Sequence, residues 1–274
     1  MNKLLTVLLP TYNNYELFLQ VIQNYIHDVR VNILVSDDSD NYIEKNSIEI
    51  FCRQNNIKYY EGPKKSAGEN FNHLIKMIKT PFFVLNHHDD YPINLDFLDI
   101  LDSKNIGLII LPCSSKVGKK ANHKIFSWQQ VIFSKICLLW PNSSFNMILA
   151  PTASVIVNSE FKNILFDSKL IWFSDADWYQ RLFRTVLKNK KFKVKFFNHS
   201  RIYSIQSENS ITSKLRDKLK KQIFKEKIYL NKKGFLPNKF LQLIQLLLLA
   251  TIISLTRLKK FIDDFFILYL FSLK

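Results

Sequence analysis

The sequence LLTVLLPTYNNYELFLQVIQNYIHDVRVNILVSDD, residues 4–38, decides the fold. Leu4–Leu9 is an almost unbroken apolar run, typical of a strand buried on both faces of a parallel sheet. Val31–Val35 is a second run of this kind. Between them, apolar residues from Phe18 to Ile26 recur at helical spacing, and Asn13 or Asn14 can cap that helix. The stretch therefore predicts two parallel strands joined by a helix.

The same alternation of short apolar runs and helical patterns continues along the chain. It predicts strands at Ile57–Tyr60, Phe82–Leu85, Ile106–Leu111, Met147–Leu149, Val155–Val157 and Phe192–Phe197, and helices over residues 71–78 and 174–187. Alternating strands and helices are typical of an α/β protein. We therefore expect an open, mostly parallel sheet flanked by helices, in a domain covering residues 1–212.

The composition excludes several classes of protein. With 47% hydrophobic and 23% charged residues in a 274-residue chain, intrinsic disorder is excluded as the main state. The 5 glycines are not spaced as G-x-G-x-x-G or as a phosphate loop ending in G-K-[ST], which excludes those nucleotide-binding motifs. The 3 cysteines are scattered, so neither a disulfide scaffold nor a zinc knuckle is expected, and a reducing compartment is favoured.

The positive charge is concentrated near the C-terminus. Of a formal net charge of +16, the residues after Ser213 carry +10, from 14 basic and 4 acidic residues. A nucleic-acid-binding protein would be expected to carry a basic stripe with stacking aromatic residues on its folded domain. Here the basic excess lies beside an apolar tail, so we expect no nucleic-acid partner.

Polar residues follow three of the predicted strands. Pro10–Asn13 follow the first strand, Asp37–Asp40 the second, and His87–Asp90 the fourth. Ligands of open α/β sheets bind at these carboxyl ends, and grouped carboxylates there need a cation, hydrogen bonds or water. Two simpler interpretations stay open: the acidic segments can be turns, and the adjacent histidines can be solvated.

The order of four segments resembles the family 2 glycosyltransferases with the GT-A fold. These are LLPTYNN, ILVSDDSDN, SAGENFNHLIK and FFVLNHHDD, and the resemblance covers about residues 3–212. It implies donor binding by Pro10, Thr11, Tyr12, Asn13, Asp37, Asp38, Asn72 and Asp90. It also implies that Asp89, with His87, binds a divalent cation, Mn²⁺ or Mg²⁺. His87 replaces the first Asp of the family's D-x-D motif.

The second half of the chain contains two further segments similar to that family. WFSDADW, followed by Arg181 and Leu182, resembles the element whose Asp is the catalytic base. The resemblance favours Asp175 as this base, with Asp177 as the rival. A purely structural interpretation has Ser174 capping a helix and Asp177 paired with Arg181. Residues 203–211 resemble the closing segment, although Gln206 replaces its usual His.

The resemblance implies an inverting transfer of a sugar from a nucleotide sugar, expected to be UDP-linked, to a hydroxyl of a glycan or lipid-linked acceptor. The expected setting is bacterial surface polysaccharide or lipopolysaccharide synthesis. Two alternatives stay open. One is a nucleotidyltransferase, although PTYNN lacks the Gly-rich phosphate loop usual there. The other is a non-catalytic membrane-bound scaffold, suggested by the altered metal-site positions.

Residues 213–274 are predicted to attach the chain to a membrane. Apolar residues at helical spacing between Leu215 and Ile228 alternate with lysines, which predicts a basic amphipathic helix. Phe240–Thr256 is a 17-residue uncharged run, at the lower edge of what spans a bilayer. We expect peripheral or monotopic attachment at the cytoplasmic face of the inner membrane. In the alternative interpretation these helices pack on the catalytic domain or form a homo-oligomer interface.

Overall fold

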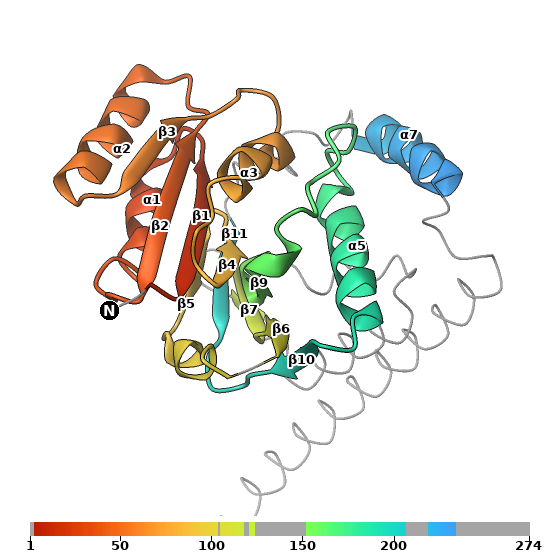
Figure 1. Cartoon of the computed structure of the whole chain (residues 1–274). Helices are drawn as coiled ribbons and strands as arrows, with labels where there is room; N and C mark the ends of the chain where they lie inside the picture. Colours follow the sequence, from red (N-terminus) through yellow and green to blue (C-terminus); the bar gives the residue numbers. More distant parts are fainter. Residues whose placement is uncertain (1–2, 104, 118–120, 124–151, 207–218, 234–274) are drawn as a thin grey trace, which may run out of the picture.

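The computed structural model describes residues 3–103, 105–117, 121–123, 152–206 and 219–233 (Figure 1). These residues form a seven-stranded sheet in the order β10-β6-β9-β4-β1-β2-β3. Its strands are β1 (Leu5–Thr11), β2 (Val31–Asp37), β3 (Lys58–Glu61), β4 (Phe82–Leu85), β6 (Ile106–Ile110), β9 (Val155–Asn158) and β10 (Lys193–Phe196). Of these seven, β9 alone is antiparallel to its neighbours.

A smaller four-stranded sheet lies beside it, in the order β5-β11-β7-β8. Its strands are β5 (Asp90–Pro92), β11 (Ile202–Gln206), β7 (Cys113–Val117) and β8 (Ala121–His123). The pairing of Ser204 with Asp90 brings β11 next to the segment that follows β4. The second sheet therefore fixes the position of that segment.

The described helices are α1 (Tyr15–Ile22), α2 (Tyr42–Gln54), α3 (Ala67–Ile75), α5 (Ser174–Lys188) and α7 (Leu219–Lys232), with short 3-10 turns at 96–100, 152–154 and 159–161. Three of these five helices, α1, α2 and α3, are capped at their N-terminus by a polar side chain. The Asn14 side chain accepts a hydrogen bond from Leu17 N–H at 3.0 Å, so Asn14 caps α1. Ser66 caps α3 in the same manner through Glu69 N–H.

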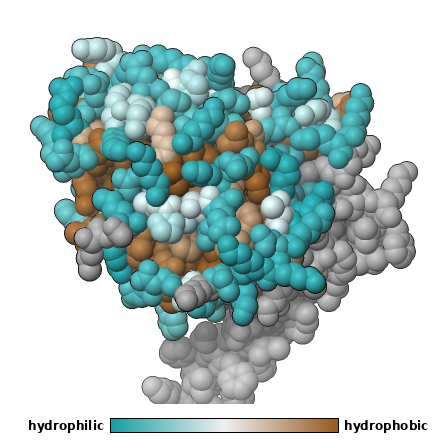
Figure 2. All heavy atoms as spheres, in the orientation of Figure 1, coloured by the Kyte–Doolittle hydropathy of each residue, from teal (hydrophilic) through white to brown (hydrophobic). Residues whose placement is uncertain are grey.

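Both faces of the main sheet are buried, as the apolar runs predict. On one face Leu5, Val7 and Leu9 of β1 pack with α1 and α2. On the other face Leu8 packs with α3 and α5 (Figure 1). The outer surface is mostly polar, and apolar atoms show towards the middle of the face drawn in Figure 2. The result is a three-layer sandwich whose strand ends at one edge are free to carry polar groups.

The α/β fold with a mostly parallel sheet, predicted from the sequence, is confirmed. The strands predicted around β1, β2, β3, β4, β6, β9 and β10 are present, as is the helix predicted at 174–187. The sequence pattern did not predict α2 or the strands of the small sheet. The predicted strand at 147–149, the boundary near Ser213 and the run 240–256 lie outside the described residues. Cys52 and Cys113 are buried, and neither is part of a disulfide.

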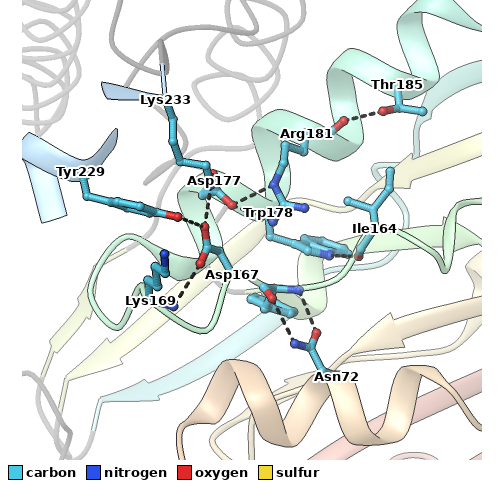
Figure 3. A network of polar contacts seen from close by, with 11 residues as sticks. Asn72, Ile164, Asp167, Lys169, Asp177, Trp178, Arg181, Thr185, Tyr229 and Lys233 are labelled. Carbon is cyan, nitrogen blue, oxygen red and sulfur yellow. Dashed lines mark hydrogen bonds and ion pairs between the residues drawn. The ribbon is translucent and has the colours of Figure 1, made fainter. Parts of the chain in front are cut away.

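Helix α7, the described part of the predicted tail, packs against the segment that precedes α5. Leu230 is buried with Leu170 and Ala176. Lys233 Nζ lies 2.6 Å from Asp167 Oδ2 and 3.3 Å from Asp177 Oδ1 (Figure 3). Within the described residues, no helix is long and apolar enough to cross a bilayer. Packing on the α/β domain is therefore established for α7.

Asp167 anchors α7 through charge, and this predicts a pH-dependent stability. Partial burial alone would raise its pKa, but hydrogen bonds from Lys233, the Lys169 N–H and Tyr229, with the charge of Lys233, lower the pKa to about 2. A carboxylate with a lowered pKa stabilises the fold above its unfolded-state pKa and loses that effect as the pH falls through the folded value. We expect Asp167→Asn to reduce the free energy of unfolding by about 2 kcal/mol at neutral pH.

Urea titrations from neutral pH down to pH about 2 provide the measurement. The difference between wild type and Asp167→Asn should shrink below the ordinary carboxyl pKa of 3.8 and vanish near 2. Glu160→Gln is the control, because Glu160 and Lys191 form a half-exposed ion pair worth at most about 1 kcal/mol. A difference that stays constant over this pH range would contradict the charge-based anchoring of α7.

Candidate functional site

The carboxyl ends of β1, β2 and β4 meet at one edge of the main sheet. Thr11 at the end of β1 is paired in register with Asp37 at the end of β2. Asn86, directly after β4, donates its N–H to the Leu8 carbonyl of β1 at 2.9 Å. The polar segments predicted to follow these strands are therefore neighbours in space. This edge is the candidate site.

Asp37 is buried at this edge, and both of its carboxylate oxygens accept hydrogen bonds from neighbouring residues. It has 0% exposed surface. Oδ1 accepts from the Thr11 hydroxyl at 3.0 Å and from Ser39 N–H at 3.0 Å. Oδ2 accepts from the Tyr59 hydroxyl at 3.1 Å. This geometry favours a role in tying β1, β2 and β3 together; direct donor binding by Asp37 stays a prediction.

Tyr12 and Asn13 both form hydrogen bonds with Asp40. Asn13 adopts a positive φ of 46°, which Asn tolerates better than most residues. Its Oδ1 accepts from the backbone N–H groups of Asp40 and Asn41 at 3.1 and 3.0 Å. The Tyr12 hydroxyl donates to Asp40 Oδ2 at 3.1 Å, while the Tyr12 side chain is 48% exposed. Pro10, one residue before Thr11, is buried inside β1. Tyr12 therefore presents an exposed aromatic face at the site.

Asp38 is the carboxylate of this segment that is half-exposed at the edge. Its Oδ1 accepts from Lys64 N–H at 2.7 Å. A Cβ on Gly62 would lie 2.2 Å from Asp38 Oδ1, so only glycine leaves room for this carboxylate. Burial raises the pKa of Asp38, and hydrogen bonds from the Lys64 backbone and the Asn70 side chain oppose the rise.

Asn70, which the sequence did not single out, adds unpaired polar atoms beside Asp38. Its amide donates to the Ser36 carbonyl at 3.2 Å. Among the described residues, Asn70 Oδ1 and Ser36 Oγ are buried without a hydrogen-bond partner. Buried polar atoms are nearly always paired, so these two mark a place where a bound ligand can supply partners. A hydrogen-bonding subsite follows at the carboxyl end of β2.

The segment after β4 carries the densest group of titratable side chains. His87, His88 and Asp89 are half-buried, and Asp90 is 1% exposed. Burial, and then the charge of Asp89, raise the pKa of Asp90 well above its ordinary range, against a hydrogen bond from Ser204. Asp90 Oδ1 has no hydrogen-bond partner among the described residues. Ionisation of Asp90 is therefore costly in these surroundings unless a ligand supplies a positive charge or a hydrogen-bond donor.

Asp175 joins this group from the first turn of α5. Burial raises the pKa of Asp175, and the neighbouring His87 and a hydrogen bond from Ser174 oppose the rise. Burial, and then the charges of Asp175 and Asp90, raise the pKa of Tyr179 well above its ordinary range. The structure therefore places the predicted residues His87, Asp90 and Asp175 within electrostatic range: His87 acts on Asp175, and Asp175 acts on Asp90.

Tyr179 was missed in the sequence, although it lies four residues after Asp175 and hence on the same face of α5. Its hydroxyl is buried without a hydrogen-bond partner among the described residues. That spacing, in a helix whose first turn carries Asp175, is the signal that could have found it. The hydroxyl is one more polar group that a ligand at this site can satisfy.

Asp177 points away from this group. It is 1% exposed, and its Oδ2 lies 2.6 Å from Arg181 while Lys233 approaches Oδ1 (Figure 3). The predicted pairing of Asp177 with Arg181 is confirmed. Ser174 does not cap α5, contrary to the purely structural interpretation, because the helix starts after Phe173 with no side-chain cap. Both carboxylate oxygens of Asp177 are thus held by basic side chains.

Asn72 also has its polar groups engaged within the chain. Its amide N–H₂ donates to the Phe166 carbonyl at 3.0 Å, and its Oδ1 accepts from Phe166 N–H at 2.7 Å (Figure 3). It is 6% exposed. This geometry ties α3 to the segment that leads into α5, and donor binding by Asn72 stays a prediction.

Within the described residues, no group of three or more His, Cys, Asp or Glu side chains is arranged to hold a metal ion. Asp89 and His87 can offer two ligands at most from this segment. Mg²⁺ is often held by one or two carboxylates with substrate phosphates completing its shell. The residues present fit a cation of that kind, shared with a phosphate-bearing ligand, and do not fit an all-protein site.

A cavity of about 560 Å³ lies at the opposite end of the strands. Its lining includes Lys3 before β1, Lys58 at the start of β3 and Thr80 before β4. These positions are at the amino ends of the strands. The cavity is therefore separate from the candidate site.

Comparison with solved structures finds this fold in S. aureus TarS. The TarS 1–349 structure superposes with a TM-score of 0.53 at 14% identity, covering 74% of this chain and 60% of that structure. Its complexes with UDP-GlcNAc and with UDP give TM-scores of 0.55 and 0.53 at 15% identity. They cover 77% and 75% of this chain and 60% and 61% of those structures. The chain thus spans about three fifths of these structures.

Neither a protein-family model nor a curated protein matches the sequence. The likeness to TarS rests on the shared arrangement of strands and helices. It agrees with the α/β fold expected from the sequence, with the polar edge at the carboxyl ends of the parallel strands.

Proposed function

We propose that this protein transfers a sugar from a nucleoside-diphosphate donor, expected to be UDP-linked, to a hydroxyl of a glycan or lipid-linked acceptor, with inversion. One observation carries the proposal: the charges of Asp90, Asp175 and His87 influence one another at the carboxyl edge of a sheet with the fold of TarS. Crystals of TarS hold UDP-GlcNAc and UDP. Surface polysaccharide or lipopolysaccharide synthesis is the process that we expect to use the product.

The nucleoside half of the donor would bind over the ends of β1 and β2. Asp38 can accept hydrogen bonds from the ribose or base, and Asn70 Oδ1 and Ser36 Oγ are unpaired beside it. Tyr12 can stack on the base, because its side chain is 48% exposed. Thr11 and Asp37 would support this pocket from below through their mutual hydrogen bond.

The transfer needs a base near the acceptor and neutralisation of the leaving diphosphate. Asp175 would take the proton of the acceptor hydroxyl while that oxygen bonds to the anomeric carbon. The bond between the anomeric carbon and the phosphate oxygen breaks, and its electron pair leaves with the nucleoside diphosphate. The raised pKa of Asp175 suits this role, since a base of higher pKa accepts a proton more readily.

A divalent cation, Mn²⁺ or Mg²⁺, would neutralise the charge on the diphosphate when bound. Asp89 would hold it, with His87 as a second ligand. The burial of Asp90 with an unpaired oxygen supports a positive charge in this region, because carboxylates grouped at low exposure are costly without one.

We also propose that α7 lies against the cytoplasmic face of the inner membrane, beside a lipid-linked acceptor. Phe224 is 66% exposed and Ile228 44% exposed, four residues apart on one face. Lys221 and Lys225 are exposed next to them. An apolar stripe flanked by lysines is typical of helices that bind the interface of anionic membranes.

The base assignment is tested by comparing Asp175→Asn with Asp177→Asn. We expect Asp175→Asn to reduce kcat by about 10²- to 10⁴-fold with donor binding retained, because only the proton acceptor is lost. Asp177→Asn should mainly reduce thermal stability, because Arg181 loses its buried carboxylate partner and Lys233 keeps only Asp167. Release of nucleoside diphosphate from a panel of nucleotide sugars measures turnover. Wild-type activity in Asp175→Asn, with loss in a folded Asp177→Asn, would move the role to Asp177.

The cation is tested by removing it. Excess chelator should reduce turnover by about 100-fold or more, and added Mn²⁺ should restore it, because the leaving diphosphate loses its neutralising charge. Asp89→Asn should reduce turnover similarly and resist restoration by metal. Full turnover in excess chelator, or an active Asp89→Ala variant, would exclude the cation from the reaction.

Membrane attachment through α7 is tested by flotation with vesicles of anionic and of zwitterionic lipid. The Phe224→Ser, Ile228→Ser double variant should bind anionic vesicles at least about ten-fold more weakly than wild type, because two apolar side chains no longer leave water. Ile43→Ser, which removes a 74% exposed side chain on α2, is the matched control. Equal flotation of wild type and the double variant would rule out this face of α7.

A further inference from the structure

Glu226 of α7 is a buried carboxylate that the proposed reaction does not use directly. It is 2% exposed. Its two oxygens accept hydrogen bonds from three consecutive backbone N–H groups, those of Ile171, Trp172 and Phe173, at 2.8–3.2 Å. Gln222, one turn earlier on α7, donates to Oε1 at 2.6 Å. All of these donors converge on one side chain.

Three consecutive N–H groups that turn towards one point form an anion-binding nest. Here the anion comes from the chain itself, from a helix more than fifty residues further on. Residues 171–173 lie in neither a helix nor a strand. Their conformation is therefore set by what binds their N–H groups, and that group is Glu226.

The nest leads directly into α5 and its first-turn carboxylate. The Phe173 carbonyl accepts the first helical hydrogen bond, from Asp177 N–H at 2.9 Å, while Phe173 N–H donates to Glu226. Phe173 precedes α5 without capping it through its side chain. Asp175 follows Phe173 by two residues. The position of the Asp175 carboxylate therefore depends on how Glu226 holds Phe173.

Other contacts of α7 hold the two ends of the same segment. Leu230 packs on Leu170 and Ala176, and Lys233 bridges Asp167 and Asp177. These contacts would keep α7 docked even if the carboxylate at 226 were neutralised. The effect of Glu226 on the nest can thus be separated experimentally from the docking of α7.

We propose that Glu226 is a positioning residue for Asp175, which makes α7 part of the catalytic unit; this inference rests on the proposed function of Asp175. Neutralising Glu226 by Gln replaces one of its oxygens with an N–H₂ group that faces backbone N–H donors. The nest then loses acceptors and residues 171–175 shift. A displacement of about 1 Å of a reacting group can cost about 10²-fold in rate.

The test is a graded set of variants of the full chain, assayed well below their unfolding temperatures. Glu226→Gln should lower kcat by about 10- to 100-fold. Glu226→Asp, which keeps the charge but is one methylene shorter, should recover part of the loss. Gln222→Ala, which leaves all three backbone bonds in place, should have the smallest effect. Glu160→Gln, the same change at an exposed carboxylate, is the control.

Two readouts separate positioning from a merely structural role. The KM for the donor and the Kd for UDP should stay within about three-fold of wild type, because the hydrogen bonds of Glu226 go to residues 171–173 and Gln222 and not to the residues of β1 and β2 proposed to bind the donor. Hydrogen–deuterium exchange should rise in Glu226→Gln for the amides of 171–175 and stay unchanged in α1 and α2. Should Glu226→Gln be too unstable to assay, Gln222→Ala and Glu226→Asp carry the test through the same split between kcat and KM.

The outcomes distinguish the two proposals. A folded Glu226→Gln variant with wild-type kcat, or with kcat and UDP affinity falling together, overturns the positioning role alone. A wild-type protein that turns over no nucleotide sugar overturns the proposed function and the positioning role with it. A selective loss of kcat, ordered Gln222→Ala, Glu226→Asp, Glu226→Gln, supports both.

Discussion

Burial of the central strands on both faces is the constraint on which the rest of the structure depends. β1 places Leu5, Val7 and Leu9 against α1 and α2, and Leu8 against α3 and α5. Polar side chains of these central strands can then reach solvent or a ligand only where the strands end. Because β1, β2 and β4 are parallel, their carboxyl ends share one edge. The sequence of short apolar runs thus determines where the chemistry lies.

At that edge the carboxylates have different roles because their surroundings differ. Asp37 is paired by Thr11, Ser39 and Tyr59 and holds the strands in register. Asp38, beside Gly62, remains half-exposed. Burial raises the pKa of both Asp90 and Asp175; the charge of Asp89 adds to the rise for Asp90, whereas His87 opposes it for Asp175. These four residues are all aspartates, yet they are candidates for different roles. Asp37 is a structural candidate, Asp38 faces the ligand site, and Asp90 and Asp175 are candidates for the reaction.

The sequence was informative wherever a local pattern decides the outcome. Parallel strands such as β1 and β2 are apolar throughout, and Asn14 lies where a cap is needed, so both could be predicted. Helix α2 buries only Ile48 and Cys52 and leaves Ile43 exposed, so its apolar pattern is weak. Strands β5, β7, β8 and β11 are three to five residues long and depend on partners distant in sequence.

The direction of individual side chains and the contacts between distant segments could not be predicted from the sequence pattern. Asn70 and Asn72 are two residues apart on α3, yet one faces Asp38 and the other clamps Phe166. Glu226 occupies the nest at residues 171–173, and no local pattern links them. Helix α7, the described part of the tail predicted as a membrane anchor, packs on the α/β domain, and only the three-dimensional structure reveals this contact.

We expect the edge formed by β1, β2 and β4 to bind a nucleoside diphosphate. Titration calorimetry of UDP against wild type, Asp38→Asn and the exposed control Glu160→Gln tests it most directly. We expect UDP to bind saturably to the wild type and to Glu160→Gln. We expect it to bind about ten-fold more weakly to Asp38→Asn, a difference of about 1.4 kcal/mol in binding free energy. Absence of UDP binding to the wild type, or equal affinity in all three proteins, would contradict it.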